Sequence, residues 1–221
     1  MNNDYRAKKA YQNIKIAKYY DKERFYKITG KLFDYLEKDK IRKSLNHLKI
    51  NKDILDLPCG TGRIKDDLER NGFKVVGGDI SIEMLNEAKL KINKYTTDFP
   101  KLIRVDAENL SFKDNTFDCV ISIRLMGHVS PDIRKNILLE MKRVSNGNII
   151  AEFYNKNIIT RMKRYYKLLI SKSINSNKFW FPVTKKELFE EIDNIGMEIK
   201  NIYPIFKYFS ETWVILLISK K

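Results

Sequence analysis

The sequence predicts an α/β fold in which a mostly parallel sheet carries helices on both faces. Two observations favour this class. From Asp53 onward, short apolar runs alternate with stretches of helical period, and repeated strand–helix–strand units build parallel sheets. Near the end of the chain, the apolar runs 197–203 and 212–219 are separated by only about eight residues. That spacing allows antiparallel pairing but leaves no room for a helical crossover.

The elements follow in order along the chain. Residues 1–50 have apolar side chains at helical spacing and are predicted to form a helical N-terminal extension. Strands are predicted at the short apolar runs 53–57, 74–77, 101–105, 117–123 and 148–153. Helices are predicted at 62–71, 81–93, 131–144, 156–172 and 184–195. Because no internal repeat or low-complexity linker is visible, residues 1–221 are interpreted as one domain.

Composition limits the class of protein. Of the 221 residues, 43% are hydrophobic, which supplies enough apolar surface for a full core. No transmembrane segment is expected, because no run of about 18 uncharged apolar residues occurs. The segment Met1–Lys18 lacks the apolar stretch of a secretory signal. Cys59 and Cys119 suit free thiols in a reducing cytosol. We therefore expect a cytoplasmic protein, either a monomer or a homodimer.

The chain is strongly basic, since 43 Lys and Arg against 28 Asp and Glu give a net charge of +15. This charge favours approach to polyanions, but lysine is spread along the whole sequence, which weakens the inference. Residues 155–181 are the most uneven segment, with seven basic residues and no acid. Within it, 156–172 predicts an inserted basic amphipathic helix. A lid over the substrate cleft is favoured, and contact with a membrane surface, a lipid substrate or nucleic acid stays open.

The most informative motif is the turn at 56–62, Asp-Leu-Pro-Cys-Gly-Thr-Gly. It follows the apolar pair Ile54-Leu55, and a helical pattern begins at Arg63. Gly60 and Gly62 let the backbone turn sharply or lie against a ligand without a Cβ in the way. Between a strand and a helix, such a turn directs backbone N–H groups and the positive end of the helix dipole at the ligand. The motif therefore predicts a nucleotide-like ligand.

Acidic residues at the ends of predicted strands narrow the ligand further. Asp79 is placed to accept both hydroxyls of a ribose, and Asp106, followed by Ala107, to accept the exocyclic amine of adenine. Asp56 would repel a pyrophosphate, but it suits an ammonium, held directly or through water. The turn lacks the lysine of a P-loop, and Pro58 stands where a dinucleotide fingerprint has its first glycine. An ammonium, a ribose and an adenine without a phosphate together indicate S-adenosylmethionine.

These motifs, in this order, resemble those of class I S-adenosylmethionine-dependent methyltransferases, in the branch that methylates ubiquinone precursors and other small molecules. The resemblance covers about 53–153. Besides the glycine turn it includes Gly78-Asp79-Ile-Ser, Asp106-Ala-Glu-Asn-Leu-Ser-Phe, Asp114-Asn-Thr-Phe-Asp-Cys-Val and Glu140-Met-Lys-Arg-Val. It implies a Rossmann-like, seven-stranded sheet in the order 3-2-1-4-5-7-6, with the last strand antiparallel.

The resemblance also implies cofactor contacts, residue by residue. Residues of the glycine turn would hold the methionine end: Asp56, Pro58, Gly60 and Gly62. Residues after the second and third strands would hold the adenosine: Asp79, Ile80, Asp106 and Ala107. Arg124, just past the fourth strand, would lie below the methyl group or the methionine end. No metal ligand is assigned.

Candidate residues on the acceptor side have two readings each. In related enzymes a Tyr-Asp pair on the N-terminal helix closes over cofactor and substrate, which makes Tyr20 a candidate catalytic residue and Tyr19 and Arg24 candidate substrate contacts. An aromatic face packed on the core is the alternative. His128, in the loop after the fourth strand, is a candidate base for a hydroxyl or amine nucleophile. A structural hydrogen bond is the plainer role for it.

Two further substrate candidates belong to the basic segment. Tyr166 lies on the apolar stripe of the predicted helix, and Trp180 follows it in Phe-Trp-Phe-Pro. They would line an apolar substrate pocket or fasten the lid.

The leading prediction is therefore an enzyme that moves a methyl group from S-adenosylmethionine to an O, N or C atom of a small-molecule or lipid-like acceptor by in-line displacement. An RNA methyltransferase is one alternative, supported by charge alone. The exit of the fourth strand lacks both Asn/Asp-Pro-Pro-aromatic and Pro-Cys, two signatures of nucleic-acid methylation. A non-catalytic module that binds the cofactor or a partner is the other alternative.

Overall fold

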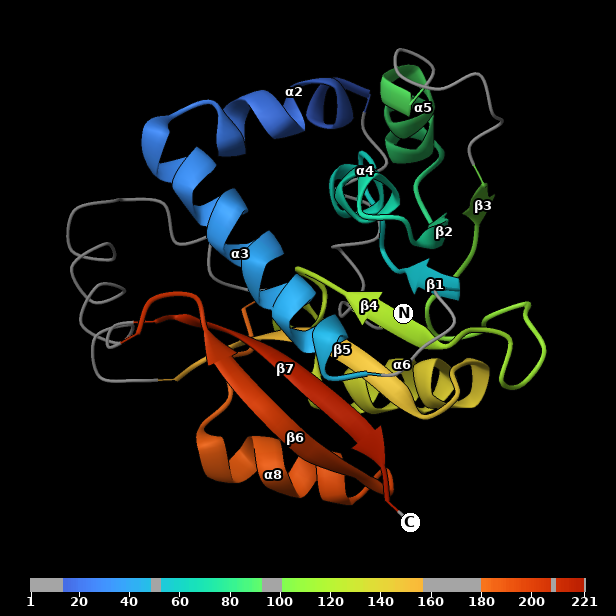
Figure 1. The fold of residues 1–221 in the computed structure, drawn as a ribbon, viewed down its shortest axis with the longest axis vertical. Helices are drawn as coiled ribbons and strands as arrows, with labels where there is room; N and C mark the ends of the chain where they lie inside the picture. Colours follow the sequence, from blue (N-terminus) through green and yellow to red (C-terminus); the bar gives the residue numbers. More distant parts are fainter. Residues whose placement is uncertain (1–13, 49–52, 93–100, 157–179, 208–209, 221) are drawn as a thin grey trace.

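The structure is a computed structural model, and it describes residues 14–48, 53–92, 101–156, 180–207 and 210–220. Within them, seven strands form one sheet in the order β3-β2-β1-β4-β5-β7-β6 (Figure 1). The strands are β1 Asp53–Asp56, β2 Lys74–Asp79, β3 Leu102–Arg104, β4 Cys119–Ser122, β5 Asn148–Tyr154, β6 Met197–Pro204 and β7 Thr212–Ser219. Neighbours among β1 to β5 pair in parallel, whereas β7 is antiparallel to both β5 and β6. The predicted strand order and the antiparallel last strand are confirmed.

The helices are α2 Ile14–Phe25, α3 Ile28–Asn46, α4 Arg63–Arg70, α5 Ile82–Ile92, α6 Pro131–Val144 and α8 Lys185–Asp193. The predicted helices at 62–71, 81–93, 131–144 and 184–195 correspond to α4, α5, α6 and α8. The described part of the N-terminal extension forms α2 and α3. The helix predicted at 156–172 lies outside the described residues, apart from Lys156. That residues 1–221 form a single domain stays a prediction.

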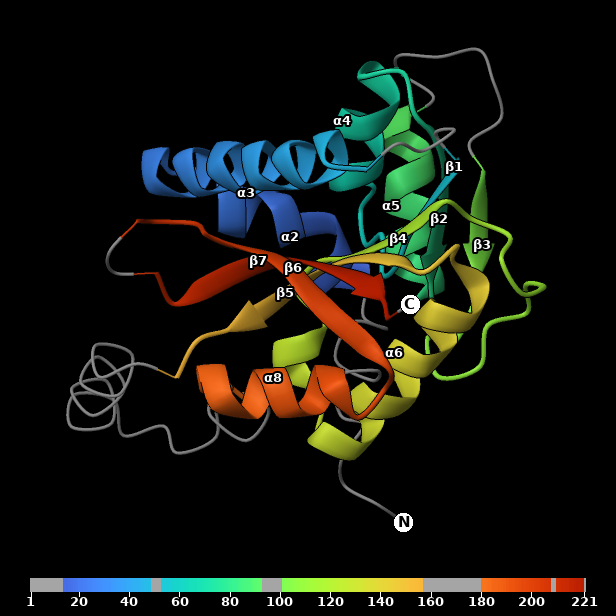
Figure 2. The ribbon, with the colours of Figure 1, turned by 60° about the horizontal axis from the view of Figure 1, so that its bottom comes forward.

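Helices cover both faces of the sheet, as Figure 2 shows for α3 and α4 on one side and α6 and α8 on the other. Side chains alternate across a strand, so each strand supplies both faces. Ile54 packs in a buried cluster with Ile41 of α3 and Leu68 of α4. Its neighbour Leu55 belongs to a second buried cluster, formed with α6 and α8. The central strands are therefore buried on both sides, as in other parallel sheets.

Local sequence determines where several of these elements begin. Thr184 and Glu187 form a reciprocal capping box at the start of α8. Pro131 occupies the first turn of α6, where its missing N–H costs no helical hydrogen bond. No helix among the described residues is long and apolar enough to cross a bilayer.

Candidate functional site

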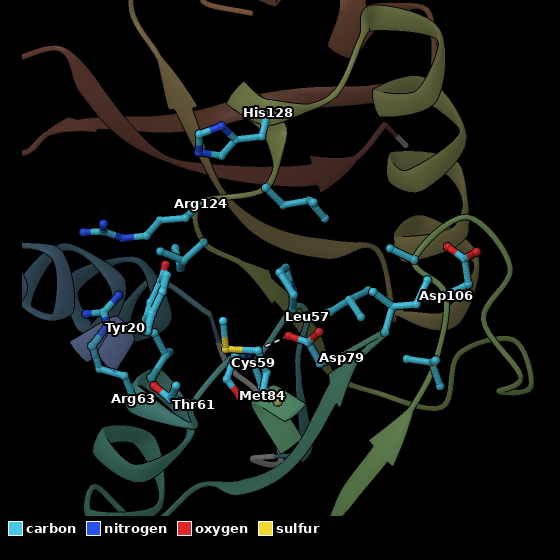
Figure 3. Close-up of a pocket in the computed structure, with 18 of the residues that line it drawn as sticks. Tyr20, Leu57, Cys59, Thr61, Arg63, Asp79, Met84, Asp106, Arg124 and His128 are labelled. Atoms are coloured by element: carbon cyan, nitrogen blue, oxygen red, sulfur yellow. Dashed lines mark hydrogen bonds between the residues drawn. The ribbon is translucent and has the colours of Figure 1, made fainter. Parts of the chain in front are cut away.

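A crevice opens at the carboxyl ends of β1, β2 and β4, where ligands bind in open α/β sheets (Figure 3). We call it the carboxyl-end crevice. Its lining comes from α2, the glycine turn, and the segments after β2, β3 and β4: Tyr20, Leu57, Pro58, Cys59, Gly60, Thr61, Arg63, Ile64, Asp79, Ile80, Met84, Val105, Asp106, Ala107, Ile123, Arg124, Leu125, His128 and Val129. Nine of the residues predicted from sequence are in this set. The fold thus gathers residues from five separate segments at one edge.

The glycine turn and Asp79 are joined by hydrogen bonds. Gly60 has a φ of 53°, and Gly62, at the start of α4, has a φ of 77°, a region that favours glycine. A Cβ on Gly60 would meet no atom within 4 Å, so the turn leaves space on the crevice side. The backbone N–H groups of Gly60 and Ser81 each donate to a carboxylate oxygen of Asp79 at 2.9 Å. Burial raises the pKa of Asp79, and these N–H donors partly offset that rise.

Asp106 lies at the opposite end of the crevice from Tyr20, with Asp79 between them (Figure 3). The Asp106 carboxylate accepts a hydrogen bond of 3.2 Å from the backbone N–H of Glu108. Apolar side chains line the crevice around the same strand ends: Ile80, Met84, Val105 and Ala107. An acid beside an apolar slot suits a flat heterocycle with an amine at its edge.

Asp56 and Gly62 are the two ends of the glycine turn and do not line the crevice. Asp56 is 1% exposed, and its Oδ2 accepts from the backbone N–H of Lys65 at 3.1 Å. Its Oδ1 is buried without a hydrogen-bond partner among the described residues. Burial raises the pKa of Asp56 to about 7. A buried oxygen without a partner is costly, and an ammonium or a bridging water would satisfy it. The predicted ammonium contact of Asp56 stays a prediction.

The other end of the crevice is basic and aromatic, with Tyr20, Arg63 and Arg124 gathered there (Figure 3). Glu37 of α3 is fully buried and pairs with both guanidinium groups, those of Arg63 and Arg124. Arg63 also pairs with Asp34. Burial alone would raise the pKa of Glu37, but the two arginines outweigh it and lower that pKa.

Glu152 of β5 completes this buried cluster. It is 2% exposed, and burial together with the nearby Glu37 charge raises its pKa well above the ordinary value. The neutral Glu152 acid then donates a hydrogen bond to the Glu37 carboxylate. Two arginines therefore face two ionised acids, Asp34 and Glu37, and the cluster is close to neutral.

Arg124 is held firmly at the crevice wall. Its guanidinium lies 4.9 Å from the ring centroid of Phe25 and 5.2 Å from that of Phe33, in addition to its ion pair with Glu37. Its φ of 62° is left-handed, which is strained for an arginine. The predicted contact of Arg124 with the methionine end stays a prediction.

His128 ends the short 3-10 helix Met126–His128 and contacts Tyr154 at the end of β5. Its Nε2 lies 3.2 Å from the Tyr154 hydroxyl, and the two rings meet edge to face with centroids 5.4 Å apart. Burial raises the pKa of Tyr154, so the phenol stays protonated. Gly127 makes this contact feasible, because a Cβ there would lie 2.1 Å from the Tyr154 ring.

The predicted substrate residues are spread more widely. Tyr19 is half-exposed, and Arg24 lies with its guanidinium 4.7 Å from the ring centroid of Tyr20; neither lines the crevice. Trp180 packs on Tyr154 with ring centroids 6.2 Å apart, just outside the lining. Tyr166 lies outside the described residues. Of the N-terminal candidates, only Tyr20 reaches the crevice.

Sequence reasoning missed several residues of the site. Arg63 follows directly after Gly62 and could have been found from that position. Glu152 could have been found as an acid inside the apolar strand Ile-Ile-Ala-Glu-Phe. Glu37 and Tyr154 carry no comparable signal, because only the fold brings them to the crevice. Among the described residues, no group of three His, Cys, Asp or Glu is placed to hold a metal ion.

The sheet order, the glycine turn and the acids after β2 and β3 define an α/β protein that binds an adenosine-type cofactor. The comparisons with known proteins carry this further. A family described as a methyltransferase domain matches residues 54–147. An uncharacterized protein of Methanocaldococcus jannaschii, MJ1252, is 30% identical over 202 residues, which cover 89% of this chain and 73% of that one.

Several relatives and solved structures are named as methyltransferases. The demethylmenaquinone methyltransferase of Paenarthrobacter aurescens is 37% identical over 110 residues, which cover 48% of this chain and only 40% of that enzyme. The magnesium protoporphyrin IX methyltransferase of Synechocystis, solved with bound S-adenosylhomocysteine, shares the fold with a TM-score of 0.71 at 15% identity, over 88% of each chain. The chain belongs to the class I S-adenosylmethionine-dependent methyltransferases. It is an enzyme of that class, and its cofactor is S-adenosylmethionine.

Proposed function

We propose that this enzyme methylates a small, largely apolar acceptor that loses a proton from an O–H, N–H or acidic C–H group as the methyl is transferred. The single observation that carries the proposal is the His128–Tyr154 pair beside a mostly apolar part of the crevice wall, formed by Ile123, Leu125 and Val129. Relatives named for quinone and porphyrin methylation support an acceptor of this kind.

In this proposal, the chain orients its ligands and removes one proton. The bound cofactor supplies an activated methyl group on a sulfonium. Asp79 and Asp106 hold the adenosine end, and Gly60 leaves space for the cofactor at the turn. The apolar crevice wall of Ile123, Leu125 and Val129 excludes water from the acceptor. Alignment of nucleophile, carbon and sulfur contributes most of the rate.

His128 accepts the acceptor's proton, and Tyr154 is its positioning residue. When His128 Nε2–H donates to the Tyr154 hydroxyl oxygen, Nδ1 is the unprotonated nitrogen. The raised pKa of Tyr154 keeps the phenol neutral, so it accepts this bond without competing for the proton.

The basic segment at 155–181 is proposed as a lid over the acceptor. Its described ends support this role. The Phe181 N–H donates to the carbonyl of Gly127 at 2.8 Å, and Trp180 packs on Tyr154. Both ends of the segment thus emerge beside His128. A cytoplasmic location likewise stays a proposal, supported by two free, buried cysteines.

A methyl-transfer assay with tritiated S-adenosylmethionine tests the proposal. The acceptors are a catechol, a demethylated quinol and bulk tRNA. We expect label on the catechol or the quinol and none on tRNA. Label on tRNA alone would favour the RNA methyltransferase, which the net charge of +15 supports. Cofactor binding without release of S-adenosylhomocysteine for any acceptor would favour the non-catalytic module.

Matched histidine variants test the role of His128. His128→Ala should lower turnover by about a hundredfold, the usual scale of general base catalysis, with cofactor affinity unchanged. The chain has only two histidines. The other one, His47, caps the end of α3 and does not line the crevice. His47→Ala should transfer methyl groups at the wild-type rate. Full turnover by His128→Ala would contradict the base.

A further inference from the structure

The outer surface of α2 and α3 carries an unusual set of exposed apolar side chains. Of the twelve large hydrophobic residues that are exposed in the described chain, seven lie within residues 14–35: Ile14, Ile16, Tyr19, Tyr26, Ile28, Leu32 and Tyr35. Ile28 is 86% exposed, Ile14 is 72% and Tyr26 is 71%. Ile14 lies two positions before Ile16 and therefore on a different side of α2, so we call the other six residues the α2–α3 face. Exposed apolar residues gathered in this way mark an interaction surface more often than single ones do.

Basic side chains are interleaved with these apolar ones. The exposed cations in the same stretch are Lys15, Lys18, Lys22, Arg24, Lys27 and Lys31. Among the described residues of this stretch, Glu23 is the only fully exposed acid. Asp21 and Asp34 are half-buried, and their carboxylates pair with Lys91 and with Arg63 and Lys38. The outward charge of the α2–α3 face is therefore positive.

The exposed apolar residues of α3 share one side of that helix. Ile28, Leu32 and Tyr35 recur at i, i+4 and i+7, which places them on one stripe. Tyr26 and Ile28 flank the elbow where α2 meets α3, at the outer edge of the molecule in Figure 1. On α2, only Ala17 is buried, so this helix presents most of its surface outward.

The geometry points to a membrane-docking surface: we propose that the α2–α3 face lies on an anionic lipid bilayer. Aliphatic and tyrosine side chains enter the boundary between headgroups and acyl chains, and lysines beside them bind anionic headgroups. Charge complementarity identifies the occupant. The exposed isoleucine and leucine side chains of the face gain nothing from a phosphate backbone, which favours lipid over nucleic acid.

The α2–α3 face is continuous with the carboxyl-end crevice. The same α2 that carries Ile16 and Tyr19 outward supplies Tyr20 to the crevice lining. Phe25, at the end of α2, packs its ring on the guanidinium groups of Arg63 and Arg124. A bilayer bound to the face would therefore lie beside the mouth of the crevice, where an apolar acceptor could enter from the lipid.

Vesicle flotation tests the proposal with the full chain. Wild-type protein should float with phosphatidylcholine vesicles that contain phosphatidylglycerol, and much less with phosphatidylcholine alone. High salt should reduce binding, because it screens the lysine contacts. The double variant Ile28→Glu, Leu32→Glu should lose about tenfold or more in partition, since two carboxylates would face the acyl region. Phe189→Glu is the control, because Phe189 on α8 is 48% exposed, as Leu32 is, and this variant should float as wild type.

Measuring cofactor affinity distinguishes a loss of membrane docking from misfolding and from a failure of the proposed function. Both variants should bind S-adenosylhomocysteine as the wild type does, because none of the three changed residues lines the crevice. Equal flotation of wild type and the double variant would overturn the proposal. So would a dimer in solution that the double variant splits, which would assign the face to a second copy. Binding of tRNA without any binding of vesicles would overturn it in favour of nucleic acid.

Discussion

Asp79 joins the glycine turn to the segment that follows β2. Its two oxygens accept the N–H groups of Gly60 and Ser81, so one carboxylate fixes both the glycine turn and the approach to α5. Charge-assisted hydrogen bonds of this kind are roughly twice as strong as neutral ones. At the same scale, Asp56 lies at the start of the turn with one oxygen unpaired among the described residues. The turn is thus supported by acids from two strands.

The raised pKa of Asp56 predicts a pH-dependent cofactor affinity. With a pKa of about 7, Asp56 is protonated below neutral pH and ionised above it. If its carboxylate holds the ammonium, affinity for S-adenosylhomocysteine should rise from about pH 6 to about pH 8. The Asp56→Asn variant cannot ionise and should show weak affinity without that rise. Calorimetric titration across this pH range measures the affinity. The same pH dependence in the wild type and in the variant would contradict the ammonium contact of Asp56.

Tyr154 offers a second prediction at the residue scale. Tyr154→Phe removes only the hydroxyl, so His128 keeps its ring contact but loses the bond that fixes its tautomer. We expect a lower turnover and a shifted pH–rate profile with a catechol acceptor, at unchanged affinity for S-adenosylhomocysteine.

A second tyrosine–histidine pair in the chain provides the control. The Tyr203 hydroxyl lies 3.2 Å from Nδ1 of His47, with ring centroids 6.1 Å apart. Tyr203→Phe should leave the pH–rate profile as it is. A wild-type profile for Tyr154→Phe would show that Tyr154 is structural only.

Cofactor-side residues could be predicted because they lie in short motifs at strand ends. Asp79 is the last residue of β2, Gly60 and Asp106 lie shortly after β1 and β3, and all three line the crevice. The acceptor side could not be predicted in the same way. Glu37, on α3, meets Arg124 across 87 residues of chain, and neither residue carries a local signal for that contact.

At the scale of elements, the side chain of Asp21 connects α2 to the glycine turn. The Asp21 carboxylate accepts from the Thr61 hydroxyl at 2.8 Å and pairs with Lys91 of α5. These contacts place Tyr20 at the crevice. Phe25, at the end of the same helix, packs on the guanidinium groups of Arg63 and Arg124, whereas Ala17 is the only residue of α2 that is fully buried.

Asp21→Ala should therefore release α2 from the turn. We expect S-adenosylhomocysteine to dissociate faster and to bind about tenfold more weakly, because a hydrogen bond to a charged group contributes about 1.5 kcal/mol or more. Glu23→Ala is the matched control, an exposed acid on the same helix. Stopped-flow dissociation measures both variants. Equal rates for the two would contradict the role of Asp21.

The cluster between α3 and β5 predicts different costs for its two glutamates. Glu37→Gln leaves Arg63 and Arg124 without their shared partner, and breaking such a buried pair costs about 3–5 kcal/mol of unfolding free energy. Glu152 is already neutral, so Glu152→Gln should cost far less. Urea unfolding near neutral pH compares them. Equal losses of unfolding free energy in the two variants would show that Glu152 is not the protonated member of the pair.

The same pKa shift gives Glu152 a signature in pH. The folded state holds a proton that the unfolded chain releases above the ordinary pKa of 4.5. Wild-type stability should therefore fall as the pH rises from that value toward the folded pKa. Glu152→Gln cannot lose a proton, so the stability of this variant relative to that of the wild type should increase over the same pH range.

Most elements could be predicted from periodicity. The α6 bounds match the predicted 131–144, and β6 and β7 pair as their short spacing required. β3 is shorter than the predicted 101–105, because an edge strand pairs on one side only and Val105 already turns toward Asp79. The elbow at 26–27 between α2 and α3 was not predicted, since no proline or turn motif marks it.

At the scale of the whole molecule, the sheet has an edge and two faces with different tasks. Its carboxyl edge forms the crevice, its two faces carry the buried clusters, and the α2–α3 face lies outward beside the crevice mouth. The central claim is that the crevice between Asp106 and Tyr20 binds an adenosyl sulfonium compound and no phosphorylated nucleotide. Every role proposed for the acceptor side depends on the binding of that cofactor in the crevice.

Calorimetric titration with S-adenosylhomocysteine, NAD and ATP tests this claim most directly. We expect S-adenosylhomocysteine alone to bind, and Asp79→Asn to weaken its binding at least about tenfold, because the variant loses a charged acceptor inside the site. Asp53→Asn, an exposed acid at the opposite end of β1, should bind as the wild type does. Tight binding of NAD or ATP with no response to S-adenosylhomocysteine would contradict the account.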